Sequence, residues 1–173
     1  MSVQVHIVPV AQSEQTVLRH LIELYVYDFS ELIGLDVDEQ GRFAFPDLAP
    51  WWTDRGRHPF FLRVQGKLAG FALVQARSAL SGAEGVYDMA EFFVLRKYRR
   101  RGVGEQAAHA LFARFPGAWE LRQRPANVAA TAFWRQVIDR YTGGKFQDLV
   151  WADATWQGPV QLFRSSSPGQ NPG

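Results

Sequence analysis

The residues best suited to chemistry lie together near the middle of the chain, in the stretch FFVLRKYRRRGVG of residues 92–104. An apolar run is followed by five basic residues in the six positions 96–101, and then by a Gly-Val-Gly turn at 102–104. Glycines let the backbone approach a ligand closely, and the first N–H groups of a helix have no partner within that helix. The helix dipole adds partial positive charge there, and arginines beside the turn can bind further phosphate oxygens. Such a turn at the start of a helix is suited to binding phosphate groups.

Three other interpretations of the turn can be weighed from the residues. Residues 102–107 fit the dinucleotide-binding pattern G-x-G-x-x-A, but charged residues separate the expected strand from the first glycine, and the motif lies past mid-chain. A P-loop is excluded, because no Lys-Ser/Thr pair follows the glycines. Nucleic-acid binding is disfavoured, because the cluster is short and the net charge is only +2. On charge alone, a solvated loop without a ligand stays open.

The elements that must position the turn are predicted from apolar spacing and turn residues. Strands are expected at Val3–Val10, Pro59–Val64, Leu68–Arg77, Val86–Leu95, Trp119–Arg122, 145–152 and 157–164. Helices are expected from a Ser13 N-cap to about Gly34, at Val103–Phe115, and from an Asn127 N-cap to Gly143–Gly144. Residues 35–57 are interpreted as a loop that leaves room for a short helix.

Two of these strands, 86–95 and 119–122, flank a helix, so we expect them to be parallel. The other strands are expected to pair as hairpins. The predicted fold class is therefore a mixed α/β (α+β) sheet with helices on its faces. A single domain is expected over residues 1–164, followed by a disordered tail at 165–173 that is rich in Ser, Gly and Pro.

The basic turn resembles the acetyl-CoA-binding segment of the GNAT acetyltransferases. In that family a strand is followed by Arg/Gln-x-x-Gly-x-Gly/Ala and then a helix. Arg99, Gly102 and Gly104 fill this pattern, after the strand that carries Val94. The proline common two residues after that valine is replaced here by Arg96.

A second motif of the same family, Asn-x-x-Ala-x-x-aromatic-aromatic, is filled by Asn127, Ala130, Phe133 and Trp134. The resemblance covers nearly the whole chain to about residue 164, and it extends to uncharacterised bacterial predicted acetyltransferases. It implies a GNAT-like fold with a central, mostly antiparallel sheet of about seven strands, a splayed parallel pair, and helices on both faces.

The resemblance also implies where acetyl-CoA binds as cosubstrate. The pantetheine arm is expected between the splayed strands, bonded to the backbone of one of them as a pseudo-strand. The pyrophosphate is expected at 99–104. Four basic residues, Arg96, Lys97, Arg100 and Arg101, are considered for the 3′-phosphate, and which of them meet it and which face water is left open. The cofactor-binding residues implied are Phe92, Phe93, Val94, Arg99, Arg100, Arg101, Gly102, Val103, Gly104, Glu105, Asn127, Phe133 and Trp134. The two aromatics of the second motif also suit a core, and Asn127 also suits a helix cap.

Catalytic candidates follow from the chemistry of amine acylation. The amine must lose a proton, and Glu91, three residues before Val94, is the first candidate for the base, with an ion pair to an arginine as the competing interpretation. Asp88 and Glu120 are weaker candidates. The family often places a tyrosine acid where this chain has Trp134, whose indole N–H is a poor proton donor. Tyr141, water, or unassisted departure of the thiolate remain as alternatives.

The function implied by the resemblance is N-acetyl transfer from acetyl-CoA to a primary amine, directly within a ternary complex. The chain has no cysteine, which excludes an acetyl-cysteine intermediate and disulfides. A non-catalytic acyl-CoA-binding sensor or interaction module is the alternative. The acceptor stays open among aminoglycosides, polyamines, amino acids and protein amines.

The acceptor pocket is expected to involve the first helix, the 35–57 loop and the last two strands. Its carboxylates could attract a cationic amine and its aromatics could stack on one, although a solvated acidic loop beside core aromatics is the competing interpretation. The residues concerned are Tyr25, Tyr27, Asp28, Glu31, Asp36, Asp38, Glu39, Trp51 and Trp52.

The sequence also bears on metal binding, membrane insertion and localisation. The four histidines have no metal-ligand spacing, so we expect no metal. No apolar run approaches the roughly 20 residues that cross a bilayer, and the N-terminus lacks the pattern of a signal peptide. We therefore expect a cytoplasmic protein without membrane or nucleic-acid partners, and leave a homodimer open.

Overall fold

The computed structural model describes residues 3–166 of the 173. Its strands are β1 (Val5–Pro9), β2 (Arg57–Val64), β3 (Lys67–Arg77), β4 (Glu84–Val94), β5 (Gly117–Arg122), β6 (Phe146–Ala152) and β7 (Gln157–Ser165). Its α-helices are α1 (Gln15–Ile33), α2 (Pro50–Thr53), α3 (Val103–Arg114) and α4 (Val128–Thr142). Two 3-10 turns, η1 (Gln12–Glu14) and η2 (Arg96–Tyr98), precede α1 and α3.

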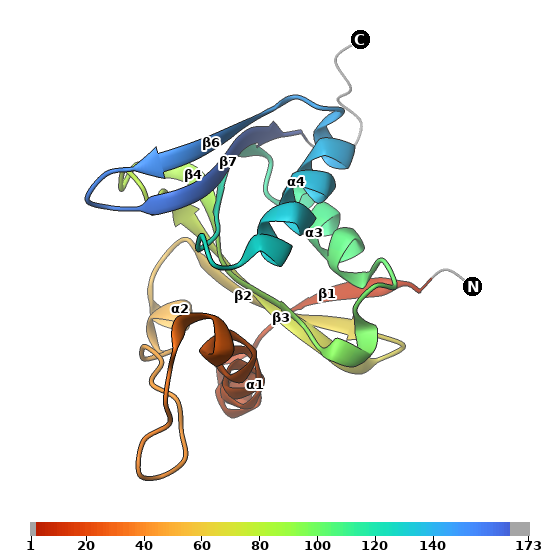
Figure 1. Ribbon diagram of the computed structural model, residues 1–173. Coiled ribbons are helices and arrows are strands. Elements are labelled where there is room, and N and C mark those ends of the chain that lie inside the picture. The colour runs from red at the N-terminus through yellow and green to blue at the C-terminus, as the bar shows by residue number, and fades with distance from the viewer. Residues whose placement is uncertain (1–2, 167–173) are drawn as a thin grey trace.

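The strands form one seven-stranded sheet in the order β1-β2-β3-β4-β5-β7-β6. Every neighbouring pair is antiparallel except β4 and β5, which are parallel. Helices α3 and α4 cover one face, and α1 and α2 lie on the other (Figure 1). The mixed fold class expected from the sequence, with its single parallel pair, is confirmed.

The parallel pair separates partway along its length. The β4–β5 ladder runs from Val86 opposite Ala118 to Asp88 opposite Glu120 and then ends. Beyond Asp88, β4 continues to Val94 paired with β3 alone, while β5 continues along β7. The two strands therefore diverge and leave a gap in the middle of the sheet.

The sheet separates two hydrophobic cores that hold the site in place. On the α3/α4 face, Phe112 packs against Trp119 and Phe163 with ring centroids 5.0 and 4.8 Å apart. On the other face, the fully buried Leu18 and Ile22 of α1 join a cluster with residues of β2, β3 and β4. Burial of apolar area in both cores supplies most of the stabilisation of such a fold.

Some predicted boundaries differ from those observed. Ser13 lies within η1 and does not cap α1, because the Glu14 side chain accepts the Ala11 N–H at 3.1 Å and a 3-10 turn forms first. The helix ends at Gly34 in the left-handed conformation, as its sequence suggests. Strand β7 includes Ser165, and residues 167–173 of the predicted tail lie outside the described residues.

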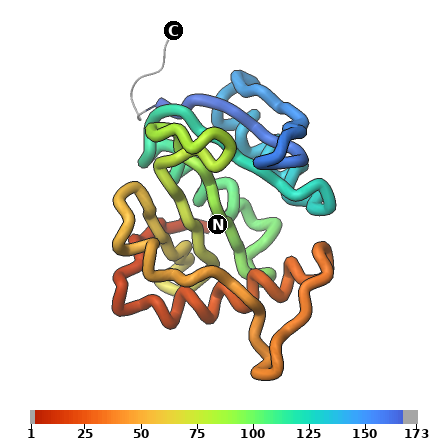
Figure 2. The backbone as a smooth tube through the Cα atoms, turned by 90° about the vertical axis from the view of Figure 1, so that its left-hand side faces the viewer, coloured from red at the N-terminus to blue at the C-terminus, as the bar shows by residue number. Residues whose placement is uncertain are grey.

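The loop that follows α1 extends away from the sheet and returns through α2 to β2 (Figure 2). Its short helix starts at Pro50, a residue whose fixed φ suits the first turn of a helix. The β2–β3 hairpin turns through Gln65 and Gly66, both with positive φ. These connections bring α1, β4 and the β6–β7 hairpin around the same gap in the sheet.

Candidate functional site

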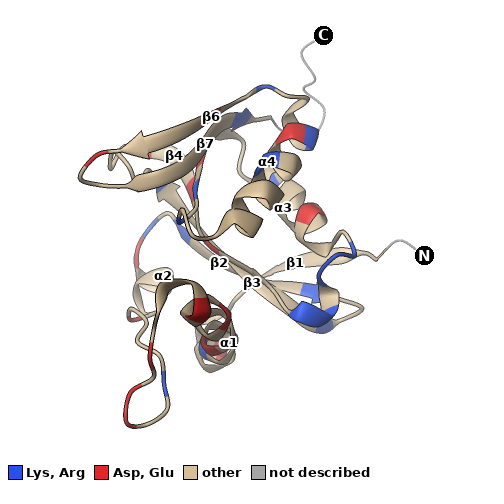
Figure 3. Ribbon diagram, viewed as in Figure 1, with Lys and Arg blue, Asp and Glu red and all other residues tan. Residues whose placement is uncertain are grey.

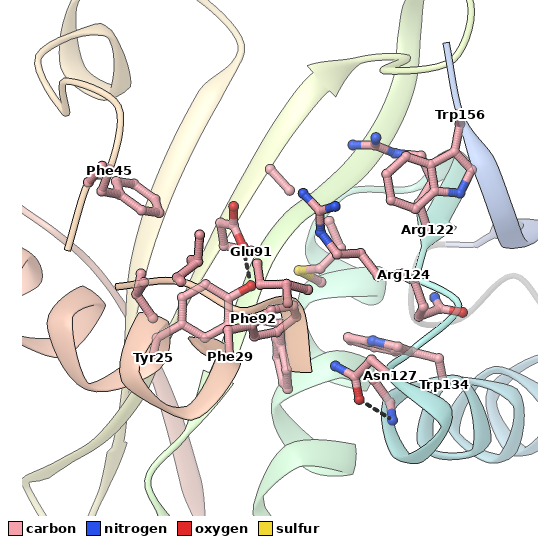
Figure 4. A pocket seen from close by; sticks show the side chains of 18 residues that line it. Tyr25, Phe29, Phe45, Glu91, Phe92, Arg122, Arg124, Asn127, Trp134 and Trp156 are labelled. Atoms are coloured by element: carbon pink, nitrogen blue, oxygen red, sulfur yellow. Dashed lines mark hydrogen bonds between the residues drawn. The ribbon is translucent and has the colours of Figure 1, made fainter. Parts of the chain in front are cut away.

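A cavity of about 370 Å³ opens where β4 and β5 diverge. One wall is formed by α1 and the following loop, and it is mainly aromatic and aliphatic. The other wall is formed by the end of β5, the start of α4 and the β6–β7 turn, and it is more polar (Figure 4). Strand β4 lies between the walls and contributes Met89, Ala90, Glu91 and Phe92.

A β-bulge in β4 determines which side chains reach each face of the sheet. Leu73 of β3 pairs with Glu91 and Val74 pairs with Met89, so Ala90 is the extra residue. After the bulge, Phe92 and Val94 pack towards α3 and α4, whereas Phe93 packs in the core around α1. Glu91 shares the α1 side with Phe93, as the alternation predicts.

Glu91 is held there by Tyr25 of α1, whose hydroxyl donates a hydrogen bond to the carboxylate. Burial raises the pKa of Glu91 to about 7, against the lowering effects of the Tyr25 hydrogen bond and of Arg122 and Arg124. Burial, together with the Glu91 charge, also raises the pKa of Tyr25 well above 10. Within residues 3–166 no arginine forms an ion pair with Glu91. The alternative role for this glutamate, an ion pair to an arginine, is therefore not observed.

The backbone of β4 beyond Asp88 forms one edge of the gap. Phe92 lies against the aromatics of α4, with ring centroids 6.2 Å from Phe133 and 4.9 Å from Trp134. Asn127 accepts the Ala130 N–H at 3.1 Å, which caps α4, and it also lines the cavity. Three predicted cofactor-binding residues, Phe92, Asn127 and Trp134, therefore line one cavity together with Glu91.

The basic turn follows the C-terminal end of β4 and leads into the start of α3 (Figure 3). Gly102 is the N-cap of α3, with a left-handed φ of 74°. Val103 is buried, and a Cβ added to Gly104 would lie 3.0 Å from the ring of Phe133. The turn therefore has glycine where the backbone conformation and the approach of α4 leave least room for a side chain. The neighbouring Glu105 forms an ion pair with Arg140 at 2.7 Å.

The arginines of this turn have different partners. Arg99 donates to the Val94 carbonyl at 2.7 Å and also pairs with Asp28 of α1. Arg96 pairs with the same carboxylate at 2.7 Å. Burial raises the pKa of Asp28, but hydrogen bonds from Arg99 and Arg96 outweigh it, and the pKa is lowered. Arg100 is exposed and has a positive φ of 58°.

Lys97 and Arg101 line a separate hollow of about 410 Å³, beside Lys67 and His6. Within residues 3–166, Lys97, Arg101 and Lys67 form no ion pair. Of the four basic residues considered for the 3′-phosphate, Arg96 is therefore the one already engaged by a carboxylate.

Tyr141 is not brought to the cavity. It lies on α4 seven residues after Trp134, which is about 10 Å further along a helix that rises 1.5 Å per residue. Its ring packs 5.2 Å from those of His109 and Phe112, and its hydroxyl lies 3.5 Å from the Ser166 carbonyl. Tyr141 is therefore on α4, the helix that contributes Trp134 to the cavity, but too far towards its C-terminus to reach the cavity.

The two weaker candidates for the base have structural partners. Buried Asp88 accepts from Gln75 at 2.9 Å and lies 3.4 Å from Arg122. Buried Glu120 accepts from the Ser78 hydroxyl at 2.7 Å and from the Leu80 N–H at 3.2 Å. Neither carboxylate lines the cavity.

The acidic residues expected around the acceptor also lie elsewhere. Asp28 is paired with arginines, and Asp38 accepts backbone N–H groups of its own exposed turn. Trp51 is buried in the core, and Trp52 donates to the Val10 carbonyl at 2.8 Å. The solvated loop beside core aromatics, which was the competing interpretation, describes Asp38, Trp51 and Trp52, whereas Tyr25 of the same predicted set does line the cavity.

The more polar wall of the cavity contains four residues that the sequence analysis did not name as site residues: Arg122, Gln123, Arg124 and Trp156. The first three belong to the segment RQRP at the end of β5. The carboxyl ends of parallel strands are where α/β sheets bind ligands, so this position was a usable signal. Trp156 lies in the β6–β7 turn; the last two strands were expected at the acceptor pocket, but no pattern in the sequence singles out this residue of their turn.

Comparisons with known proteins agree with this geometry. The model of the acetyltransferase (GNAT) family matches residues 19–137, more than half of the chain. None of the curated proteins matches the sequence. Among solved structures, an acetyltransferase from Thermus thermophilus is similar, with a TM-score of 0.68 and 17% identity over 94% of this chain and 98% of that chain.

Two further solved structures share the fold. The ribosomal-protein-S18-alanine N-acetyltransferase of Escherichia coli has a TM-score of 0.57 and 18% identity, over 97% of this chain and 98% of that chain. An aminoglycoside acetyltransferase from an uncultured soil metagenomic sample, in complex with sisomicin, has a TM-score of 0.55 and 17% identity, over 77% of this chain and 86% of that chain. At these identities the likeness shows the fold alone.

Two kinds of feature are absent from the described part of the chain. No helix within residues 3–166 has the length and apolar character needed to cross a membrane. No group of three or more His, Asp or Glu side chains in the same range is placed to hold a metal ion.

Proposed function

Because the chain belongs to the GNAT acetyltransferase family, we propose that it transfers an acetyl group from acetyl-CoA to a primary amine, directly within a ternary complex. The observation that carries the proposal is Glu91, a carboxylate with a pKa of about 7 in a cavity beside the unpaired edge of β4. A general base is most effective when its pKa lies near the working pH.

Two features support acetyl-CoA as the donor. The edge of β4 beyond Asp88 offers main-chain groups that the amides of a pantetheine arm can pair with. At the end of the same strand, the glycine turn presents the free N–H groups of α3, with Arg100 and Arg101 exposed nearby. The arm and the pyrophosphate would thus be bound by one continuous segment, 92–104.

The proposed reaction begins when the Glu91 carboxylate takes a proton from the ammonium form of the acceptor. The neutral nitrogen then attacks the thioester carbonyl carbon, so that a C–N bond forms and the C–S bond breaks, and the nitrogen, which becomes cationic on attack, releases its second proton to water. The leaving thiolate keeps the electron pair of the C–S bond and takes its proton from water, because Tyr141 lies outside the cavity. Tyr25 does line the cavity, but its proton is bonded to Glu91 and its pKa is raised well above 10.

Calorimetric titration of acetyl-CoA into the wild type and into Gly102→Asp tests the donor site. We expect micromolar binding by the wild type and its loss in the variant, because a carboxylate beside the turn repels phosphate. Gly41→Asp is the matched control, since Gly41 has a similar φ of 72° but lies in the loop after α1 with open space around it. A folded wild type that does not bind acetyl-CoA would overturn the proposal.

Release of free thiol in the presence of an amine panel tests turnover. The panel should include small primary amines, amino acids, a polyamine and an aminoglycoside. Turnover that is lost in Glu91→Gln supports an enzyme. Binding of acetyl-CoA without turnover of any amine would favour the non-catalytic acyl-CoA-binding module instead.

A further inference from the structure

The polar wall of the cavity carries hydrogen-bonding groups that no other described residue satisfies. Gln123 is 4% exposed, and neither its Nε2 nor its Oε1 has a hydrogen-bond partner within residues 3–166. The Nε1 donor of Trp156 is likewise buried without a partner in that range. Leaving such groups unpaired is costly, so buried polar atoms beside a cavity indicate a polar ligand.

The same wall is positively charged. Arg122 is engaged, since it pairs with Asp88 at 3.4 Å and its Cζ lies 5.0 Å from the centroid of the Trp156 ring. Arg124 has neither an ion pair nor a side-chain hydrogen bond with any residue of the described chain. Arg124 lines the cavity together with Glu91 and Tyr25, and its charge lowers the pKa of each.

Glu91 is the one carboxylate among the described residues that line the cavity. Because Arg122 is paired with Asp88, the guanidinium of Arg124 remains without a balancing carboxylate within residues 3–166 once Glu91 holds the proton of the amine. The wall opposite Arg124 is apolar and includes Phe29 and Phe45 (Figure 4). The cavity thus presents a base, a cationic donor wall and an apolar wall.

We propose that the acceptor amine also carries a carboxylate, bound by Arg124 and the Gln123 side-chain NH₂, so that the substrate is a small amino acid with an apolar side chain. A guanidinium binds a carboxylate through two parallel N–H bonds. The cavity volume of about 370 Å³ is near the lower end for ligand pockets, and the cavity also borders the β4 edge proposed for the pantetheine arm, so the space left suits a small acceptor. This inference rests on the proposed function and names its acceptor class.

The arrangement also selects against some amines. A polyamine or an aminoglycoside brings several positive charges to a wall that already holds Arg122 and Arg124, and like charges in a partly dry site repel strongly. An amino acid amide has the same amine and side chain as the free acid but lacks the negative charge. It is therefore the sharpest comparison for the proposal.

The test compares kcat/KM for L-leucine with L-leucinamide and for L-phenylalanine with L-phenylalaninamide, with spermidine as the polycation. We expect the acids to exceed their amides by about tenfold to a hundredfold, the value of a charge-assisted hydrogen bond. In Arg124→Gln that preference should fall to within a few fold, while the Kd for acetyl-CoA stays unchanged. Arg164→Gln is the control, because Arg164 is an exposed arginine of β7 that does not line the cavity.

A second arm measures binding without turnover. N-acetyl-L-leucine and N-acetyl-L-leucinamide are titrated into the protein saturated with coenzyme A, in the wild type, Arg124→Gln and Gln123→Leu. The acid should bind at least about tenfold more tightly in the wild type, and each variant should reduce that margin. Gln123→Leu should still fold, because it removes only polar atoms that have no partner among the described residues.

The two arms separate failure of this inference from failure of the proposed function. Equal use and equal binding of acids and amides, unaffected by Arg124→Gln, would overturn the inference even if amines are acetylated. Weaker acetyl-CoA binding in Arg124→Gln, with the acid preference intact, would also overturn it. Carboxylate-dependent binding without turnover would support the carboxylate site and count against catalysis.

Discussion

The hydroxyl of Tyr25 on α1 donates its hydrogen bond to the carboxylate of Glu91 on β4, across 66 residues of sequence. This bond joins the helix that forms the acceptor wall to the strand that forms the donor edge. It also offsets part of the rise in the pKa of Glu91 that burial causes, because a hydrogen bond to the ionised carboxylate favours the ionised form. The balance of the two effects leaves a buried glutamate whose pKa of about 7 lies well above its ordinary value.

The first prediction concerns pH. With saturating acetyl-CoA and amine, kcat should rise with pH through an apparent pKa of about 7, because Glu91 accepts a proton only when ionised. Glu91→Gln should lower kcat by about 10²–10⁴ and abolish this limb. Glu84→Gln, an exposed glutamate on the same strand, is the control. If kcat of Glu91→Gln still rose with pH through the same apparent pKa, the titrating group would be a residue other than Glu91.

The second prediction separates Tyr25 from Glu91. In Tyr25→Phe the hydrogen bond to the carboxylate is lost, so the pKa of Glu91 should rise further and the acid limb of kcat should move to higher pH. A bond to a charged group corresponds to a displacement of about one pH unit or more. Tyr27→Phe, an exposed tyrosine of the same helix, should leave the profile in place. A limb displaced towards lower pH contradicts the assignment.

The third prediction is that the ionised Glu91 carboxylate lowers the free energy of unfolding. The ordinary pKa of this glutamate is 4.5 and the folded-state pKa is about 7, so its contribution to stability is present below pH 4.5 and is lost as pH rises through 7. Glu91→Gln stays neutral throughout. Its free energy of unfolding should exceed that of the wild type by roughly 3 kcal/mol at pH 8, and by less than about 1 kcal/mol at pH 5.

Urea unfolding of both proteins at the two pH values measures this difference. Glu84→Gln should track the wild type at both, since that side chain is exposed. A Glu91→Gln variant that is less stable than the wild type at pH 8 would mean that the carboxylate stabilises the fold, and the base assignment would lose its physical basis.

Parts of the site governed by local chemistry could be predicted from the sequence. Asn127 caps α4, Gly102 takes the left-handed conformation at the start of α3, and β4 and β5 are parallel because a helix connects them. Each of these depends on residues within one turn or one crossover. Strand alternation also predicts that Glu91 and Phe93 share one face of the sheet, and this holds because the bulge at Ala90 falls before both residues.

Parts that depend on distant segments could not be predicted. Nothing in the sequence around Tyr25 indicates that its partner is Glu91, and nothing around Gln123 indicates that its amide stays unpaired beside a cavity. Tyr141 was a candidate acid because it is the tyrosine nearest in sequence to Trp134, but the rise of helix α4 carries it away from the cavity. The acidic residues after α1 looked suited to a cationic amine, whereas arginines from β5 and the segment after it line the cavity.

The last prediction concerns Gly70 of β3. Its φ lies outside the left-handed region, so its backbone conformation does not require glycine, and no sequence pattern marks the position. A Cβ added there would lie 2.0 Å from the Phe93 carbonyl oxygen and 3.1 Å from the Val94 Cα. Backbone cannot rotate away as a side-chain end can, so β4 must shift at the edge proposed for the pantetheine arm. Gly70→Ala should therefore lose about 2–4 kcal/mol of unfolding free energy and bind acetyl-CoA more weakly.

Gly34→Ala is the matched control for this substitution. Gly34 has a φ of 65° and no atom within 4 Å of the added Cβ, so its variant should lose only about 1 kcal/mol from backbone conformation and keep its affinity for acetyl-CoA. Urea unfolding and calorimetric titration of both variants measure the contrast. If Gly70→Ala is as stable as Gly34→Ala and binds acetyl-CoA as the wild type does, then β4 tolerates displacement at Phe93 and Val94, and its edge is not the positioning element for the donor.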